Sequence, residues 1–313
     1  MAMWWKSVWW KTVWWKSMII AAPVILAIML SPSAVAQDAH IPDRMMRLSA
    51  GAQQTVGTPR VVSLGGSVTE IIYALGAERQ LVGVDQSSLY PLQAQQLPSV
   101  GYYRRLPVEG VASLRPTLVI ASEHAGPSGV MEKLASLGVP TLKVSDQPTV
   151  ESLHQRIRSV AAAVSRENQA EVLIQQFDDA LSRARELPAS GLRAMTVVMR
   201  GGKWLGAGHG TVADVVLREA GLNNVMSDQA SYQPLTPESL SVMAPEVIIV
   251  TSGTVQAMGG LRAVKASPVL RATPAVQQGR VMVLDDLLAQ GFGLRLPEAV
   301  RDIRQELAHV AKP

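Results

Sequence analysis

Two stretches of the sequence share one pattern. Residues 109–122 read EGVASLRPTLVIAS, and residues 238–251 read ESLSVMAPEVIIVT. In each stretch a glutamate stands seven residues before a proline, and an apolar run follows the proline. Proline ends a helix, and a short apolar run is consistent with a buried strand. The repeat therefore predicts the same unit in both halves of the chain: a helix, a break and a buried strand.

Other strands and helices alternate on either side of the two copies. The apolar runs that predict strands are residues 60–64, 81–84, 118–121 and 141–144 in the first half, and residues 194–199, 247–251 and 280–284 in the second. Short helices are expected between them, and the first should run to Leu75 with Ser67 or Thr69 as its capping residue. Strands that alternate with helices are typical of parallel sheets. We therefore expect an α/β fold with two Rossmann-like lobes.

A long stretch without glycine or proline separates the two halves. It runs from Val150 to Leu187, and its apolar residues recur at helical spacing, as in Leu153, Ile157 and Val160. The spacing predicts either one long helix or two abutting helices. We expect a long, rigid backbone helix to join the lobes and to permit only a small movement between them.

The first 36 residues indicate export. Three lysines, Lys6, Lys11 and Lys16, precede the apolar run Met18–Leu30, and residues 34–36 read AVA, a small-x-small cleavage motif. The apolar run is shorter than the roughly 20 residues that span a bilayer. We therefore predict a cleavable secretory signal peptide and a periplasmic protein; the alternative is an uncleaved membrane anchor.

These segments give the predicted domain organisation. We assign residues 1–36 to the signal peptide, 37–58 to a flexible leader, 59–149 to the N-terminal α/β lobe, 150–188 to the connecting helix, 189–296 to the C-terminal α/β lobe and 297–313 to a closing helix. Each lobe is long enough to bury its own sheet, so we expect the mature protein to be a soluble monomer.

The composition excludes several classes of protein. The 313 residues include no cysteine, which excludes a disulfide scaffold and a cysteine-ligated metal site. With 48% hydrophobic and 17% charged residues, the chain does not have the composition of a disordered protein. Removal of residues 1–36 leaves 26 basic and 25 acidic residues, and Trp204 as the one remaining tryptophan. A nucleic-acid-binding protein would show a basic surplus and stacking aromatics, so we expect no nucleic-acid partner.

Two further motifs carry a resemblance to a known family. Residues 101–110 read GYYRRLPVEG, and residues 291–300 read GFGLRLPEAV. With the blocks 60–76 and 114–120, they resemble the helical-backbone class of periplasmic binding proteins, class III, over about residues 58–312. The two motifs are similar to the haem-binding proteins of bacterial haem ABC importers. The resemblance implies a protein that captures ferric haem between two lobes and delivers it to an inner-membrane permease and, through the permease, to its ATPase.

The resemblance makes Tyr102 the axial ligand of the haem iron. A phenolate is a hard, anionic oxygen donor that suits ferric iron. Phenols have a reference pKa of about 10, so ionisation at neutral pH needs the iron and a nearby cation, which Arg104 or Arg105 can supply. Tyr103 is the less favoured ligand and is expected to stack on the porphyrin. The alternative is that Tyr102 or Tyr103 is a loop tyrosine packed on a lobe.

The second lobe offers three more haem-binding candidates, Arg200, Trp204 and His209. Arg200 should follow a strand and pair with a propionate or hydrogen-bond the ligand oxygen. Some relatives place a histidine close to this point, where this chain has Arg200. Trp204 is expected either to cover a porphyrin face or to be buried by packing. His209 is a candidate distal ligand, and its alternative role is that of a polar loop residue near a helix start.

The remaining candidates have weaker support. His124 follows a predicted strand, and Arg262 and Arg295 are possible propionate partners; for all three the alternative is an ordinary surface or structural role. We expect no role in the site for the other histidines, His40, His154 and His309.

Glu109 and Glu238 have a different predicted role. In the class that this chain resembles, one glutamate of each lobe docks onto arginines of the permease, and the repeated spacing from glutamate to proline identifies this pair. Both acids should lie at helix N-termini, where the helix dipole favours a carboxylate. The alternative is therefore that both are simple capping residues.

Two rival functions are left open. The first is a binding protein of the same class for a cobalamin or a ferric siderophore. The second is a periplasmic hydrolase or metal enzyme, for which the adjacent pair Asp285 and Asp286 could hold a metal, although a solvated loop after a strand is the favoured explanation of this pair. The sequence has no Gly-x-Ser-x-Gly, His-Glu-x-x-His or Walker motif, so we expect no enzyme.

Overall fold

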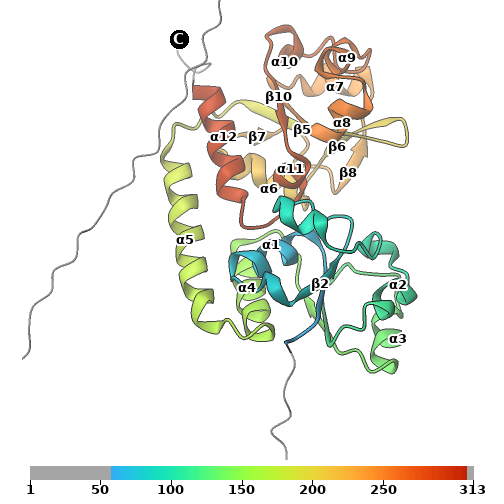
Figure 1. Ribbon diagram of the computed structural model, residues 1–313. Helices are drawn as coiled ribbons and strands as arrows, with labels where there is room; N and C mark the ends of the chain where they lie inside the picture. The colour runs from blue at the N-terminus through green and yellow to red at the C-terminus, as the bar shows by residue number, and fades with distance from the viewer. Residues whose placement is uncertain (1–57, 309–313) are drawn as a thin grey trace, which may run out of the picture. The chain divides into compact units, whose positions relative to one another are not determined.

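Two β-sheets organise the residues that the structure describes, 58–308 of this computed structural model (Figure 1). The N-terminal sheet has the strand order β2-β1-β3-β4, and all four strands are parallel. Its strands are β1 (Val61–Leu64), β2 (Leu81–Val84), β3 (Leu118–Ser122) and β4 (Thr141–Val144). The predicted signal peptide, the leader up to residue 57, His40 and His309 lie outside the described residues.

The C-terminal sheet has the order β10-β9-β5-β6-β8, with β7 beside the start of β5. Its strands are β5 (Arg193–Arg200), β6 (Lys203–Ala207), β7 (Asn223–Asn224), β8 (Tyr232–Pro234), β9 (Val247–Thr251) and β10 (Val281–Leu284). Strands β10, β9 and β5 are parallel, whereas β6 and β8 run antiparallel to their neighbours. The antiparallel strands were not predicted from the sequence.

Helices connect the strands in both halves. Those around the first sheet are α1 (Gly66–Ala74), α2 (Val108–Ser113) and α3 (Val130–Ser136), with the 3₁₀ turns η1 (Glu78–Gln80), η2 (Leu92–Gln96) and η3 (Tyr103–Arg105). Those around the second are α6 (Val212–Glu219), α7 (Pro237–Met243), α8 (Ser252–Ala257), α9 (Leu261–Ala266), α10 (Pro274–Gln277), α11 (Asp286–Gln290) and α12 (Leu296–Ala308). The α/β class is thus confirmed. Among the described helices, none has the length and apolar character needed to cross a membrane.

We use the terms N-terminal lobe for residues 59–149 and C-terminal lobe for residues 189–296; these boundaries stay predictions. Both belong to one compact unit, Thr55–Pro313. One hydrophobic cluster takes buried residues from α1, from the connecting helices, from α6 and from α12, among them Ile71, Ile157, Val216 and Val300. The lobes therefore share part of their core, and each also has a hydrophobic cluster of its own.

The connector consists of two helices, α4 (Val150–Ala163) and α5 (Glu167–Glu186). This is the second of the two alternatives that the spacing left open. The break occurs at Ser165, which has a left-handed backbone with φ 55° and so cannot continue a right-handed helix. Figure 1 shows α5 beside α12, and Arg304 of α12 donates to the carbonyl of Leu187 at the end of α5.

Helix α1 begins earlier than the sequence predicted. Its capping residue is Gly65, with φ 116°, and no side chain of its own caps the helix. The N–H of Gly65 instead donates to Asp85 Oδ1, 2.9 Å away. A carboxylate after β2 therefore accepts the backbone N–H at the start of the helix. The prediction that Ser67 or Thr69 caps the helix was wrong: both lie inside α1, and the hydroxyl of Thr69 bonds that of Ser63 at 2.7 Å.

The internal repeat is visible in the backbone. Arg115 and Ala244, which precede the two matching prolines, both have left-handed backbones, with φ 46° and 40°. In each lobe an arginine near the start of a central strand donates to a backbone carbonyl at the end of the helix that precedes the proline. Arg60 donates to Leu114 O at 2.8 Å, and Arg193 donates to Ala244 O at 2.9 Å. The two lobes thus end α2 and α7 by the same device.

The carboxyl edges of the two sheets meet. Parallel strands end at a common edge, and ligands of α/β proteins bind beyond this edge. Gly66, just after β1, lies close to α11 of the C-terminal lobe: a Cβ atom at Gly66 would be 3.6 Å from the Leu287 side chain. Arg156 of α4 donates both to Ser145 O, just after β4, and to Phe292 O, between α11 and α12. The fold thereby brings the loops that follow strands in both lobes close to one another.

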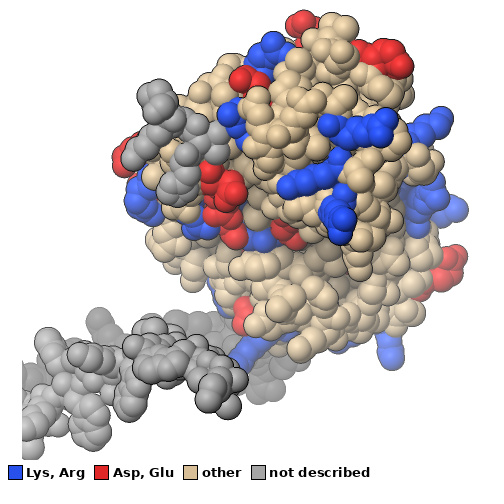
Figure 2. Space-filling view, turned by 90° about the horizontal axis from the view of Figure 1, so that it is seen from above, with Lys and Arg blue, Asp and Glu red and all other residues tan. Residues whose placement is uncertain are grey.

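Charge is mixed on the face seen in Figure 2. Basic side chains lie close together in places on this face, and acidic side chains and uncharged surface interrupt them. The picture agrees with the near balance of 26 basic and 25 acidic residues that follows residue 36.

Candidate functional site

Tyr102 lies at the carboxyl edge of the N-terminal sheet. The chain before it runs along the end of β2, where Val100 N–H donates to Val84 O and Gln86 N–H donates to Gly101 O, both at 2.9 Å. Gly101 has φ 95°, a left-handed conformation that favours glycine, and it turns the chain out of this pairing. Tyr102 follows directly, and its side chain is 42% exposed. The phenol is therefore available to a ligand at this edge.

Tyr103 fixes the segment to the lobe. Its side chain is half-buried against the cluster that includes Leu106 and Val111. Its carbonyl accepts from Gly126 N–H at 2.9 Å, and Leu106 N–H donates to Gly126 O at 2.8 Å. The loop after β3, which also carries the exposed His124, therefore holds residues 102–106, the tyrosine segment, in place. The rings of Tyr102 and Tyr103 meet edge to face, with centroids 5.1 Å apart.

Arg104 gives this pair of tyrosines a cation. Its Nε donates to Tyr103 Oη at 3.0 Å, and its guanidinium lies 5.2 Å from the centre of the Tyr103 ring. Burial raises the pKa of Tyr103, and the charge of Arg104 opposes this rise. Burial alone would lower the pKa of Arg104, but interactions with Tyr103 and then Tyr102 raise it overall. The structure thus brings Tyr102, Tyr103 and Arg104 together at this edge, and their role in one site stays a prediction.

A second tyrosine–arginine pair lies at the carboxyl end of β5 in the C-terminal lobe. The guanidinium of Arg200 lies 4.7 Å from the centre of the Tyr232 ring, and its Nη2 donates to Gln290 Oε1 at 2.7 Å. Burial raises the pKa of Tyr232, and Arg200 opposes this rise. Within the described residues, the hydrogen-bond partner of Arg200 is thus a neutral amide, which leaves its positive charge for a ligand anion.

Sequence reasoning missed Tyr232 and Gln290. Neither belongs to a motif, and each reaches Arg200 only through tertiary structure: Tyr232 begins β8, and Gln290 ends α11. The one available signal was the rarity of tyrosine, with five in this chain, which makes each tyrosine a candidate for a specific role.

In the part of the chain that the structure describes, Trp204 and His209 do not join the pair formed by Arg200 and Tyr232. Trp204 is 6% exposed and belongs to the core cluster of the C-terminal lobe, which favours the packing alternative. Strand β6 pairs with β5 so that Lys203 lies opposite Arg200, and Gly206 lies opposite Val197. His209 continues the strand away from that end, about 20 Å from Arg200 at 3.3 Å per residue. It is exposed at the opposite end of the hairpin.

The weaker candidates have ordinary surroundings. Arg262 is exposed on α9, and His154 bonds Asp178 at 2.9 Å between α4 and α5. Asp285 caps α11, and Asp286 accepts from Ser252 and from Gly253 N–H. In the described part of the chain, no group of three or more His, Cys, Asp or Glu residues is arranged to hold a metal ion.

The two predicted docking glutamates occupy equivalent positions. Glu109 lies in the first turn of α2 and Glu238 in the first turn of α7, and both are exposed. Hydrogen bonds to its own backbone N–H and then to Thr236 lower the pKa of Glu238. Each helix begins near the carboxyl edge of its sheet, because Leu106 bonds the loop after β3 and Leu235 N–H donates to Trp204 O. The pair thus lies on the same side of each lobe as the tyrosine–arginine pairs.

Arg295 belongs to a partly buried cluster. Its Nε lies 3.5 Å from Glu70 Oε1 and its Nη2 lies 3.4 Å from Asp285 Oδ1, while its guanidinium lies 4.1 Å from the centre of the Tyr90 ring. Glu70 is 7% exposed, and burial raises its pKa to about 7 although Arg295 opposes the rise. Arg295 thus joins the segment before α12 to α1 and has protein partners on both sides. It also lines a cavity of about 590 Å³ between α5 and α12, in which neither Tyr102 nor Arg200 takes part.

Comparisons with known proteins agree with this architecture. The profile of the family described as "Periplasmic binding protein" matches residues 61–288. The solved structure of the periplasmic heme-binding protein RhuT from Roseiflexus sp. RS-1 is 35% identical, with a TM-score of 0.78 over 82% of this chain and 100% of that one. A periplasmic heme-binding protein from Pseudomonas aeruginosa is 33% identical, with a TM-score of 0.74 over 82% of this chain and 94% of that one.

A relative of another specificity is also similar. The vitamin B12-binding protein of Yersinia pestis (strain Pestoides F) is 29% identical over 197 residues, which cover 62% of this chain and 70% of that protein. The resemblance inferred from the two sequence motifs is confirmed, since solved structures that it resembles are heme-binding proteins. The similarity to a B12-binding protein keeps the first rival ligand open.

We predict that Glu70→Gln changes how stability depends on pH. The pKa of Glu70 is about 7 in the folded protein against an ordinary value of 4.5, so the folded state binds the proton more tightly. Glu70 therefore stabilises the fold below pH 4.5, and this contribution is lost as the pH rises to about 7. In urea titrations, the free energy of unfolding of Glu70→Gln relative to the unchanged protein should rise by about 2–3 kcal/mol from pH 5 to pH 8.

Glu306→Gln is the matched control, because Glu306 is exposed on α12 and should give a flat difference over the same range. A flat or falling difference for Glu70→Gln would contradict the role given to its burial.

Proposed function

The chain belongs to the periplasmic binding protein family, and we propose that its ligand is ferric haem, bound between the two lobes. The observation that carries the proposal is the exposed phenol of Tyr102, which meets the ring of the Arg104-bonded Tyr103 at the carboxyl edge of a parallel sheet. The heme-binding proteins among the similar solved structures support the same ligand class. We propose binding and delivery rather than catalysis as the activity.

Tyr102 is the proposed axial ligand. Its oxygen has to lose a proton to bind iron, and the ferric ion and the positive charge of Arg104 both favour the phenolate. Tyr103 is the less suitable ligand, because its hydroxyl already accepts from Arg104 and its ring is half-buried in the lobe. In this proposal Tyr103 and Arg104 fix the orientation of Tyr102 and complete the wall of the haem site.

Arg200 is the proposed partner of a haem propionate from the other lobe. Tyr232 and Gln290 hold its guanidinium at the carboxyl end of β5 without neutralising it. A guanidinium pairs with a carboxylate through charge-assisted, often bidentate hydrogen bonds, and the exposed Arg200 can offer such a pair to a ligand. His209 and Trp204 have a smaller part in this proposal, since one lies at the other end of the hairpin and the other is in the core.

Cobalamin is the second candidate ligand, and the similarity to the B12-binding protein favours it. The peripheral side chains of a cobalamin are amides apart from one phosphodiester, whereas haem carries two carboxylates. A cobalamin would therefore offer Arg200 one anion in place of two, and it would make no use of the phenol of Tyr102. These two residues favour haem over cobalamin.

We propose that the protein acts in the periplasm as a monomer. A chain cleaved after Ala36 would carry the haem to an inner-membrane ABC permease, and Glu109 and Glu238 would dock on that permease. The two exposed acids, one from each lobe at equivalent helix starts, support this arrangement. The ATPase would contact the permease and not this protein.

We predict that Tyr102→Phe severely weakens the binding of ferric haem. The change keeps the ring and removes the oxygen that would bind iron, so the loss should exceed the roughly 10- to 100-fold typical of changes around a metal ligand. Titration of the purified protein with ferric haem, followed by its visible absorption, measures both the affinity and the phenolate charge-transfer band.

Tyr103→Phe is the control, because it keeps the packing of the half-buried ring and removes only the hydroxyl that Arg104 bonds. We expect this variant to retain the band and most of the affinity. An unchanged spectrum and affinity in Tyr102→Phe would show that Tyr102 is not the ligand.

We predict that Glu109→Ala and Glu238→Ala leave haem affinity intact and slow haem uptake by cells that carry the permease. The expected reason is the loss of an ion pair with the permease from each lobe. Glu132→Ala is the matched control, since Glu132 is also an exposed acid in the first turn of a short helix, α3. If all three variants affected uptake equally, Glu109 and Glu238 would be simple capping residues. If Glu109→Ala or Glu238→Ala lost haem affinity, these residues would belong to the haem site.

A further inference from the structure

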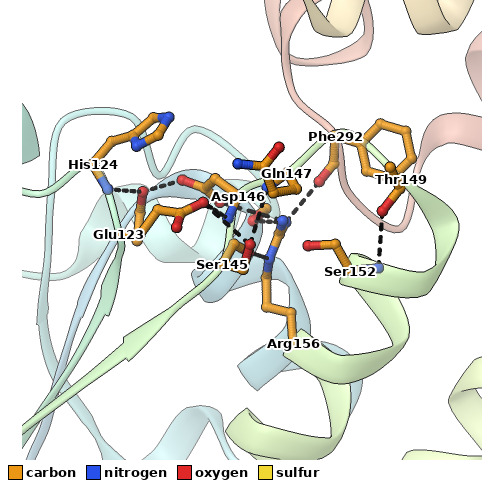
Figure 3. A network of polar contacts seen from close by, with 11 residues as sticks. Glu123, His124, Ser145, Asp146, Gln147, Thr149, Ser152, Arg156 and Phe292 are labelled. Carbon is orange, nitrogen blue, oxygen red and sulfur yellow. Dashed lines mark hydrogen bonds and ion pairs between the residues drawn. The ribbon is translucent and has the colours of Figure 1, made fainter. Parts of the chain in front are cut away.

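Arg156 is a buried arginine that contacts both lobes from the connector. It lies on α4 and is 2% exposed. Its Nε donates to Ser145 O at 2.6 Å, and its Nη1 donates to Ser67 Oγ of α1 at 2.8 Å. Nη1 also donates to Phe292 O at 2.8 Å, and Figure 3 shows Arg156 between Ser145 and Phe292. The first two acceptors belong to the N-terminal lobe, and the third belongs to the segment between α11 and α12.

The network continues from Arg156 toward the tyrosine segment. Its Nη2 lies 3.4 Å from Asp146 Oδ1, and the carboxylate of Asp146 accepts from the hydroxyl of Ser122 at the end of β3. The oxygen of Ser122 in turn accepts from His124 N–H at 3.1 Å. This loop continues to Gly126, which exchanges two backbone hydrogen bonds with the segment of Tyr103.

The network also approaches the other half of the proposed site. Phe292 lies two residues after Gln290, whose amide oxygen accepts from Arg200. A carbonyl at position 292 that is held by Arg156 therefore restricts the position of Gln290 and of the guanidinium bound to it. Arg156 thus stands between the groups that would bind iron and the group that would bind a propionate.

The chemistry of Arg156 makes this contact sensitive to the position of the lobes. A buried guanidinium is costly unless hydrogen bonds and charges compensate it. Within the described residues, Nη2 of Arg156 has no hydrogen-bond partner and contacts only the carboxylate of Asp146 as an ion pair. The guanidinium therefore has no spare acceptor to replace one that it loses. If the C-terminal lobe moved away, the buried charge would lose the carbonyl of Phe292. The arginine therefore favours one position of segment 292–295 over others.

We propose that Arg156 is a positioning residue that holds the C-terminal lobe in register with the ligand-binding edge of the N-terminal lobe and thereby slows ligand release. The part of this proposal that concerns release rests on the proposed haem function. The part that concerns the position of the lobes does not, since it can be measured on the protein without ligand.

The first experiment measures the distance between the lobes in the absence of ligand. The sequence has no cysteine, so Leu137→Cys and Val242→Cys give two unique labelling sites, on exposed residues of the N-terminal and C-terminal lobes. Spin labels at these sites report a distribution of distances. Arg156→Met should broaden or shift this distribution relative to the labelled parent.

Two further variants make the result specific. Arg158→Met is the matched control on the same helix, because Arg158 is exposed and pairs with Glu171 across the two connector helices. It should leave the distribution unchanged. Arg156→Lys keeps the charge but cannot reach Ser145 O and Phe292 O together, so it should fold and give an intermediate distribution. Narrow, unshifted distributions in both Arg156 variants would overturn the proposal.

The second experiment measures release. Ferric haem bound to each variant is transferred to an excess of apomyoglobin, and the transfer is followed by absorption. Arg156→Lys should release haem about tenfold faster with an unchanged absorption spectrum, as expected for the loss of a hydrogen bond from a charged donor. An unchanged release rate would contradict the effect on release. If the protein binds no haem, the proposed function fails, whereas the distances between the lobes still decide the role of Arg156.

Discussion

The hydrogen-bond demand of one buried guanidinium, that of Arg156, constrains how the two lobes meet. Burial lowers the pKa of this group, with Asp146 and Glu123 opposing the effect, and removal of a partner from a buried charge typically costs about 3–5 kcal/mol. One of its acceptors, Phe292 O, belongs to the segment that follows the C-terminal sheet. The charge is therefore satisfied only while that segment lies on the end of the N-terminal sheet. Arg156 lies on α4, before the break between α4 and α5, so the break does not interrupt the helix that carries it.

This arrangement gives the proposed ligand two complementary edges. Each lobe presents an arginine over a tyrosine ring at its carboxyl edge, Arg104 with Tyr103 and Arg200 with Tyr232. In the N-terminal lobe the pair stands beside an exposed phenol that suits ferric iron. In the C-terminal lobe it leaves a positive charge that suits a carboxylate. Haem combines these two features in one molecule, which is why we propose haem as the ligand in preference to a cobalamin.

Local patterns in the sequence predicted much of the fold and less of the site. The repeat around Pro116 and Pro245 predicted a break and a strand, because proline and apolar runs act locally. The left-handed residue that divides the connector, Ser165, has no such signature, so the spacing could not choose between one helix and two. In the site, a motif identified the contiguous residues from Tyr102 to Arg104. Partners that meet only through tertiary packing, such as Tyr232 with Arg200, were not predicted. For Trp204 the sequence left two roles open, and its burial favours packing.

Ferric haem bound between the two edges through a phenolate would show directly in the visible spectrum. The most direct measurement titrates protein purified from the periplasm with ferric haem and, in parallel, with cyanocobalamin, while recording the visible spectrum. We expect saturable binding of haem with a high-spin phenolate-to-iron charge-transfer band, and no spectral change or binding with cyanocobalamin. Tight binding of cyanocobalamin, or a haem complex whose spectrum matches that of free haem, would contradict it.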